Sequence, residues 1–392
     1  MTEKIKLGDV IIDIAAGPFG SNLKVSCFVD DGFPIVDGAN LKGYKLTDNI
    51  TKFVTEEKAR SLHRSIAKRN DVVVTISGTV GQISYIPLDS KYEEYLCSQR
   101  QFRATFDTSR VYVPYLVFYF HTFEGQHKIL SFANQVGVPA LAQPLKNFRL
   151  IDIDLPDIET QKRIADIVET INNKIEANDA INENLQEQAQ AIYHHMIIEN
   201  ADAAWTPGVL SDIAVITMGQ SPKGESYNED GVGTVFFQGR AEFGFRFPTR
   251  RLYTTDPKRM AQANDALMSV RAPVGDMNVA YEDCCIGRGL GAIRSKHGHQ
   301  SFVLYTMFAL REQLNVFNGE GTVFGSINRD ALNSMPVDTP PKKIMDQFED
   351  IVAPMDAAIR NNYDEICRLQ AMRDSLLPRL ISGELDVSDI DL

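Results

Sequence analysis

The clearest pattern in the sequence is a long run of apolar residues spaced alternately four and three positions apart. It begins after Leu155-Pro156-Asp157, where a proline followed by an acidic residue is typical of a helix start. An apolar period of 3.5 residues predicts a helix with a coiled-coil seam. Residues 157–198 would form a rod of roughly 63 Å at about 1.5 Å per residue. No small domain needs such a rod for its own core.

The same spacing returns near the end of the sequence, at an offset of 184 residues, so that Phe348 aligns with Ile164. Pro354 lies inside this second run. Because proline has no amide donor, we expect it to kink the second helix or to start it afresh.

Two seams in one chain can pair with each other, and an antiparallel arrangement would place one globular domain at each end. One register sets Ile164 opposite Leu380 and Asn182 opposite Asn362. A buried asparagine pair would fix that register, although these asparagines can equally face solvent at a frayed midpoint. The positions predicted to pair the helices are Ile164, Val168, Ile171, Ile175, Asn182, Leu185, Asn362, Ile366, Leu369, Leu376 and Leu380.

The segments before the two rods also resemble each other. LGDV at 7–10 recurs as LSDI at 210–213, NDVVVT at 70–75 recurs as NDALMS at 264–269, and Arg100 recurs as Arg288. The offset drifts from 203 to 194 to 188, as insertions and deletions in a duplicated unit would produce. Residues 71–76 and 83–86 are predicted strands, and 112–122 is a predicted amphipathic helix.

The predicted fold is therefore α+β, with two similar globular domains separated by two long antiparallel coiled-coil helices in a pseudo-twofold internal repeat. The predicted segments are a first domain at 1–156, a central helix at 157–200, a second domain at 201–340, and a C-terminal helix and tail at 341–392.

Charge divides along the same boundaries. The net charge is −12, of which residues 157–200 carry −6 and residues 341–392 carry −5. The two predicted domains are close to neutral, so each can still present a basic face. No apolar run reaches the ~20 residues that span a bilayer. The five cysteines are odd in number and have no CxxC spacing, which favours a reduced, cytoplasmic protein.

Two segments carry a resemblance to a known family. LPDIETQKRIA at 155–165 resembles the Pro-x-x-Glu-x-Gln-x-x-Ile-Ala opening of helical regions in the specificity (S) subunits of type I restriction-modification systems. RDSLLPRLISGEL at 373–385 is similar to the family's C-terminal Leu-Leu-x-x-Leu-x-Ser-Gly signature. The segment PPKKIMDQ at 340–347 departs from the pattern, because it lacks the Glu-x-Gln pair.

The resemblance implies a non-catalytic DNA-reading subunit. Each globular region would be a target recognition domain for one half of a bipartite sequence in double-stranded DNA. The helices would set the unread gap and dock two methyltransferase (M) subunits, which restriction/motor (R) subunits join. The chain itself would hold no cofactor, with S-adenosylmethionine, ATP and Mg²⁺ on its partner subunits.

Base edges are read mainly by Arg, Lys, Asn and Gln, and phosphates are bound by Lys, Arg, Ser and Thr. Polar loop residues of these types are therefore the candidate DNA contacts. Because Arg100 and Arg288 recur together, they are expected to be shared phosphate contacts. The candidates in the first domain are Ser21, Asn22, Lys24, Asn40, Lys42, Lys45, Thr79, Gln99, Arg100 and Gln101, and those in the second are Lys223, Gln238, Arg240, Arg246, Arg250, Arg251, Arg271 and Arg288.

Two other classes of function are an enzyme and a coiled-coil scaffold. A methyltransferase of this kind needs an Asn-Pro-Pro-aromatic or similar tetrad, which the sequence lacks. The histidine pairs His194-His195 and His297-Gly298-His299 have no cysteine or carboxylate partners at metal-ligand spacing, so no metal site is predicted. A coiled-coil interaction scaffold that reads no DNA sequence would explain the helices but not the repeated Arg-bearing loops.

Overall fold

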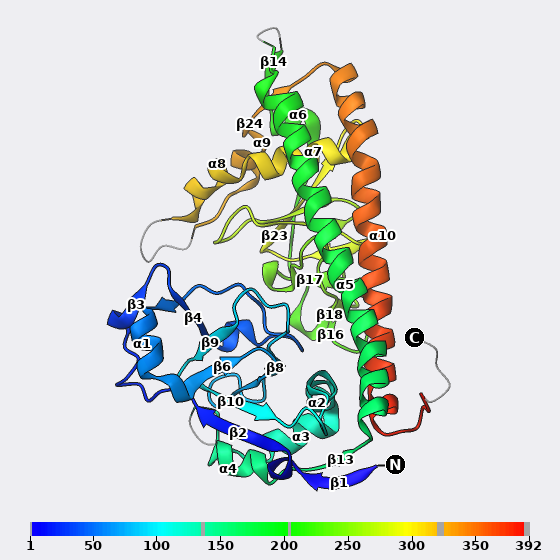
Figure 1. Cartoon of the computed structure of the whole chain (residues 1–392). Coiled ribbons are helices and arrows are strands. Elements are labelled where there is room, and N and C mark those ends of the chain that lie inside the picture. Colours follow the sequence, from blue (N-terminus) through cyan, green and yellow to red (C-terminus); the bar gives the residue numbers. More distant parts are fainter. Residues whose placement is uncertain (1, 135–137, 203–204, 320–324, 388–392) are drawn as a thin grey trace. The chain divides into compact units, whose positions relative to one another are not determined.

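The computed structural model describes residues 2–134, 138–202, 205–319 and 325–387, and its contacts divide the chain into two units. Unit 1 comprises Met1–Glu176 with Ile366–Leu392, and unit 2 comprises Ala177–Glu365. Each unit therefore contains a globular part and a portion of both long helices. Helix α5 runs from Ile158 to Tyr193, and helix α10 runs from Lys342 to Ile381 (Figure 1).

The globular part of each unit combines small, mostly antiparallel sheets with short helices. In unit 1 the strands are β1 (Glu3–Lys6), β2 (Ile11–Ala16), β3 (Phe28–Val29), β4 (Phe33–Val36), β5 (Phe53–Val54), β6 (Ile66–Lys68), β7 (Val72–Thr75), β8 (Ile83–Tyr85), β9 (Glu94–Cys97), β10 (Gln101–Phe106), β11 (Ala133–Asn134), β12 (Ala140–Leu141) and β13 (Asp152–Leu155). In unit 2 they are β14 (Thr206–Val209), β15 (Ala214–Met218), β16 (Tyr227–Asn228), β17 (Thr234–Phe237), β18 (Leu252–Thr254), β19 (Met260–Ala261), β20 (Ala266–Ser269), β21 (Met277–Val279), β22 (Cys284–Ile286), β23 (Leu290–Ser295) and β24 (Pro336–Thr339).

The two units have the same strand orders. A four-stranded sheet has the order β2-β10-β7-β8 in unit 1 and β15-β23-β20-β21 in unit 2. A five-stranded sheet has the order β3-β5-β4-β9-β6 in unit 1 and β16-β18-β17-β22-β19 in unit 2. In each five-stranded sheet one pair is parallel, β4 with β9 and β17 with β22. The pairs β1-β13 and β14-β24 join the first and last strands of the respective globular parts.

Short helices cover the sheets. They are α1 (Glu56–Ser61), α2 (Val113–Phe120), α3 (Phe123–Leu130) and α4 (Pro144–Arg149) in unit 1, and α6 (Leu210–Ile213), α7 (Gln300–Ala309), α8 (Arg311–Asn315) and α9 (Arg329–Asn333) in unit 2. The predicted helix at 112–122 exists as α2, but it is not amphipathic, because all eight of its residues are buried. It is enclosed within the core of unit 1, next to strand β8 and helix α3.

The predicted seam is buried along α5. Ile164 and Val168 belong to the core of unit 1, and Ile171 and Ile175 form a smaller apolar cluster there with Ile366 of α10. In unit 2, Leu185 and the fully buried Ala189 continue the seam. The apolar spacing therefore marks the helix faces that are covered by protein.

The alternative that the second helix starts afresh at Pro354 is wrong. Helix α10 continues through this position from Lys342 to Ile381. Proline removes a single amide donor, whereas Phe348, Val352 and Ile359 around it are almost completely buried in the core of unit 2. Burial of such side chains is worth about 1.5–3 kcal/mol each, enough to offset the cost of one proline.

The predicted asparagine pair is present in unit 2. The side-chain amide of Asn362 donates to Oδ1 of Asn182 at 2.9 Å, and Asn182 is only 3% exposed. One turn away, the amide of Asn178 donates to the Glu365 carboxylate at 2.8 Å. In unit 1 the same antiparallel register places Arg373 beside Asn172, 3.2 Å apart. The asparagines face the partner helix rather than solvent.

Replacement of Asn362 by alanine should lower the free energy of unfolding by about 1–3 kcal/mol, because the buried Asn182 loses its donor. The double variant Asn182→Leu/Asn362→Leu should recover most of that loss, since neither helix then buries an unpaired amide. Denaturant titration measures both. The matched control is Asn361→Ala, an exposed neighbour; equal losses at 361 and 362 would contradict the role of the pair.

The stability of unit 1 should also depend on pH through His121. Burial lowers the pKa of this imidazole, whose Nε2 lies 2.8 Å from the Ile83 carbonyl oxygen. Below the ordinary histidine pKa of about 6.5, the unfolded chain takes up a proton that the folded chain resists. The unfolding free energy should therefore fall as pH decreases from about 6.5 toward the lowered folded pKa.

His121→Gln should make this pH slope shallower, whereas His127→Gln, at an exposed position of α3, should leave it unchanged. Denaturant midpoints at pH 7.5 and pH 5.5 measure the difference between variants. An identical slope in wild type and His121→Gln would show that the histidine does not contribute.

Candidate nucleic-acid interface

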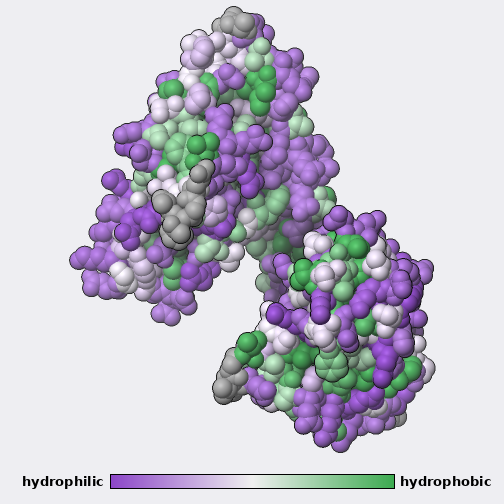
Figure 2. Space-filling model, turned by 90° about the vertical axis from the view of Figure 1, so that its left-hand side faces the viewer, coloured by the Kyte–Doolittle hydropathy of each residue, from purple (hydrophilic) through white to green (hydrophobic). Residues whose placement is uncertain are grey.

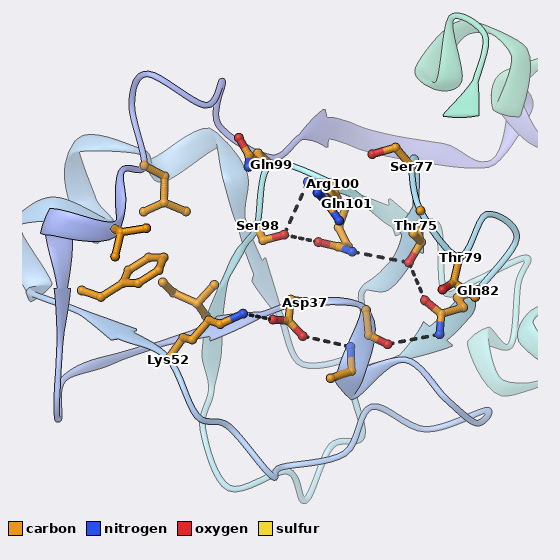
Figure 3. A pocket seen from close by; sticks show the side chains of 17 residues that line it. Asp37, Lys52, Thr75, Ser77, Thr79, Gln82, Ser98, Gln99, Arg100 and Gln101 are labelled. Atoms are coloured by element: carbon orange, nitrogen blue, oxygen red, sulfur yellow. Dashed lines mark hydrogen bonds and ion pairs between the residues drawn. The ribbon is translucent and has the colours of Figure 1, made fainter. Parts of the chain in front are cut away.

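Unit 1 contains a cavity of about 640 Å³ where several of the predicted DNA loops meet. Its lining comes from the loop before β3, the 3-10 helix η3 (Gly38–Asn40), the turn after β7 and the loop between β9 and β10. Leu23, Val25, Phe28 and Ile35 give it an apolar portion. The polar lining residues, labelled in Figure 3, include Thr79, Gln82, Gln99 and Arg100.

The backbone of the loop that follows β2 approaches the loop between β9 and β10 very closely. A Cβ atom on Gly17 would lie 1.8 Å from the Ser98 carbonyl oxygen, so only glycine fits there. Gly219 has the same relation to Gly287 in unit 2, with a distance of 2.1 Å. These glycines hold the loops together at the site in both units.

Most of the polar side chains in the floor of the cavity are bound to one another. Thr75 donates to Oε1 of Gln82 at 3.1 Å, and Nε2 of Gln82 donates to the Gly38 carbonyl at 3.1 Å. Ser98 donates to Gln101, which donates to Thr75 (Figure 3). This network fixes η3 against the turn after β7, and the exposed polar residues of the lining include Gln99, Arg100 and Thr79.

An ion pair lies at the side of the cavity. Nζ of Lys52 contacts Oδ2 of Asp37 at 2.6 Å. Burial would raise the pKa of the Asp37 carboxyl, but the hydrogen bonds from Lys52 and the Ala39 amide and the Lys52 charge lower it overall. Asp37 is therefore an ionised carboxylate whose charge is balanced by Lys52. It repels a phosphate less strongly than an unpaired carboxylate would.

Three candidates in unit 1 have structural roles. Asn40 is 4% exposed and donates to the carbonyls of Thr47 and Asn49, and Gln101 is 1% exposed within the network above. Lys45 donates to Asn173 of α5 at 2.9 Å and lies 3.8 Å from Glu176. We remove these three from the candidate DNA contacts. Ser21, Asn22, Lys24, Lys42, Thr79, Gln99 and Arg100 are exposed and remain candidates.

Arg246 of unit 2 is also a structural residue. It is 4% exposed, pairs with Asp356 of α10 at 3.3 Å and donates to the Tyr305 hydroxyl at 3.0 Å. A side chain enclosed in this way cannot contact DNA. The sequence could not reveal this structural role, because the partner Asp356 lies 110 positions away, in the predicted C-terminal helix.

The other candidates in unit 2 are exposed. Arg250 pairs with Glu282 at 2.5 Å, and Arg251 pairs with the buried Glu242 at 2.6 Å. No ion pair is seen for Arg271 or Arg288 within the part of the chain that the structure describes. Exposed candidates in this unit are Lys223, Gln238, Arg240, Arg250, Arg251, Arg271 and Arg288.

Strand pairing corrects one sequence equivalence. Gln101 pairs with Thr75 in unit 1, and Leu290 pairs with Ser269 in unit 2. The offset at this loop is therefore 189, so Arg288 corresponds to Gln99, and Arg100 corresponds to Gly289. The prediction that Arg100 and Arg288 occupy the same place is wrong by one residue, although both lie in the same loop.

A different basic position is shared. Lys24 and Lys223 each directly precede a three-residue 3-10 helix, Val25–Cys27 and Gly224–Ser226, and both are exposed. Sequence comparison missed this pair because the flanking residues differ. Gln82, Asp37 and Lys52 were also missed, since their roles depend on loops brought together only in the fold.

Comparison with known proteins agrees with this geometry. Residues 3–187 match the type I restriction modification DNA specificity domain. The putative type I restriction enzyme MjaX specificity subunit of Methanocaldococcus jannaschii is 28% identical over 292 residues, which cover 70% of this chain and 68% of that protein. The chain is therefore similar to type I restriction enzyme specificity subunits over most of its length, and its first half matches their DNA specificity domain.

Further specificity subunits extend the similarity. The type I restriction enzyme MjaIX specificity subunit of the same organism is 19% identical over 368 residues, covering 86% of this chain and 82% of that protein. A crystal structure of a type I restriction-modification system S subunit from M. genitalium covers 97% of this chain and 96% of its own, with a TM-score of 0.60 and 13% identity. At that identity the likeness shows the fold.

The described residues contain no group of three or more His, Cys, Asp and Glu side chains placed to hold a metal ion. Among the helices of the same residues, none is long and apolar enough to cross a membrane. On the face drawn in Figure 2, hydrophilic residues predominate and apolar residues form small separate groups.

We propose that Lys24 and Lys223 are phosphate contacts. Lys24→Ala and Lys223→Ala should then each weaken DNA binding by a similar factor on matched and unmatched sequences, because a phosphate contact carries no base information. Each should also reduce the slope of log K against log salt by about 1. Fluorescence anisotropy at several salt concentrations measures both quantities. Lys343→Ala, at an exposed position of α10, removes the same charge and serves as the control; an equal slope change there would contradict the assignment.

Proposed function

We propose that this chain is the non-catalytic subunit that reads a bipartite target in double-stranded DNA. Each globular part would be a target recognition domain for one half of the target. The observation that carries the proposal is the shared strand order of two units, with exposed polar and basic loops at the same topological position in each. DNA readers commonly use one recognition module for each half-site.

The long helices would serve as spacer and as protein dock. Helix α5 has 36 residues, which corresponds to about 54 Å at 1.5 Å per residue. Nearly all the net negative charge lies in the two helical segments, which makes them poor ligands for DNA and better suited to protein partners. Two methyltransferase subunits would bind there, and restriction/motor subunits would join that complex.

Catalysis would belong to those partners. S-adenosylmethionine, ATP and Mg²⁺ would be held by the methyltransferase and motor subunits, and this chain would determine where they act. The repeat would be a pseudo-twofold duplication, so that two half-sites are read by related surfaces. The chain would work in the cytoplasm, with the DNA and its partner subunits.

Methylome sequencing of cells with and without the gene tests the proposal. Loss of one split methylation motif is the expected result. An unchanged methylome would overturn the DNA-reading function and would favour a coiled-coil scaffold that reads no sequence.

Exchange of residues 206–339 for the matching segment of another specificity subunit tests the division of labour. The segment begins at β14 and ends at its partner β24, so the exchange keeps the helices intact. One half of the methylated motif should change and the other half should persist. A change in both halves would contradict the assignment of one half-site to each unit.

A further inference from the structure

Corresponding positions in the two units carry different side chains at the centre of the candidate site. The 3-10 helix η7 (Arg240–Glu242) of unit 2 corresponds to η3 of unit 1, since Thr249 bonds back to Glu242 as Thr47 bonds back to Asn40. Arg240 therefore opens η7 where Gly38 opens η3. Unit 2 has a long cationic side chain where unit 1 has none.

The partner of Arg240 is also in a corresponding position. Asp276 receives the backbone hydrogen bond from Ser269, as Gln82 does from Thr75. In unit 1 Gln82 holds η3 through the Gly38 carbonyl, and in unit 2 the Asp276 carboxylate holds η7 through the Arg240 guanidinium. The 3-10 helix is thus held through a backbone carbonyl in unit 1 and through an arginine side chain in unit 2.

Asp276 is well anchored for this role. Its amide donates to Oγ of Ser269 at 3.0 Å, and that hydroxyl donates to the Pro273 carbonyl at 2.6 Å. The Asp276 side chain is 25% exposed, whereas that of Arg240 is 49% exposed. The carboxylate contacts one guanidinium nitrogen of Arg240 and also lies 3.7 Å from Nη2 of Arg311, and about half of the Arg240 side chain stays exposed.

An arginine restrained in this way matches one base. The guanidinium presents five N–H donors in a planar fork, and a guanine in the major groove presents two acceptors, O6 and N7. We propose that Arg240 reads a guanine in the half-site of unit 2, with Asp276 as its positioning residue. Unit 1, which has Gly38 at this place, makes no such contact. This inference rests on the proposed DNA-reading function.

The experiment uses the full chain assembled with its methyltransferase subunits, on oligonucleotides that carry the motif found by methylome sequencing. Each guanine of the unit 2 half-site is replaced in turn. At one guanine, the wild type should lose roughly 5- to 150-fold in affinity on replacement, as is typical for a bidentate base contact. Arg240→Ala should abolish that discrimination at this position and keep it elsewhere.

Two further variants separate reading from simple charge. Arg240→Lys keeps the charge but not the fork, so it should lose most of the discrimination while retaining the salt dependence of binding. Asp276→Asn should reduce discrimination at the same guanine only. Arg60→Ala is the matched control, since Arg60 pairs with Glu94 at 2.5 Å with side-chain exposures of 52% and 23%.

The outcomes are distinct. If Arg240→Ala weakens binding equally on all sequences, Arg240 contacts a phosphate and the inference is wrong. If the unit 2 half-site contains no guanine, or every guanine keeps its discrimination in Arg240→Ala, it is also wrong, although the DNA-reading function stands. If deletion of the gene leaves the methylome unchanged, the proposed function itself fails.

Discussion

The antiparallel pairing of α5 and α10 is the constraint on which the rest of the structure depends. Each globular part packs against both helices, and its apolar core includes their seam residues. Apolar seams tolerate sliding by a whole heptad, because any shift of seven residues restores apolar contacts. The bond between Asn362 and Asn182 does not tolerate it, because a slipped register would bury two unpaired amides. This polar pair therefore helps to fix which residues of α10 lie opposite which residues of α5.

Polar residues define the register of the helices, but polar residues in the loops could not be assigned to DNA binding or to structure from the sequence alone. The helix seam could be predicted because its period depends only on local geometry, and the strands around 72–75 and 83–85 could be predicted from local apolar runs. The candidate site could not be resolved in the same way. Asn40, Lys45 and Arg246 are residue types that often contact DNA, yet Asn40 bonds within its own loop and Lys45 and Arg246 bond to partners distant in sequence. Only the fold distinguishes a polar side chain that completes a core from one that faces solvent.

The corresponding positions of the two units could likewise be only partly predicted from the sequence. Local identity aligned Arg100 with Arg288, whereas strand pairing moves the alignment by one residue in that loop. Backbone hydrogen bonds therefore identify corresponding positions in the two units more reliably than the side chains, which differ between the units. Lys24 and Lys223 show the converse, since they share a place in the fold without a shared sequence around them. A common strand order can in this way keep one basic position while the neighbouring side chains change.

The division of the chain into units also has a consequence for folding during synthesis. Unit 2 is one continuous stretch, residues 177–365, whereas unit 1 needs residues from 366 onward to complete its core, including the buried Leu377 and Leu380. The ribosome therefore releases every residue of unit 2 before it releases the last helical turns required by unit 1. Domains usually complete their folding from the N-terminal end as the chain emerges. Here the unit made first can complete its core only after every residue of the second has been synthesised.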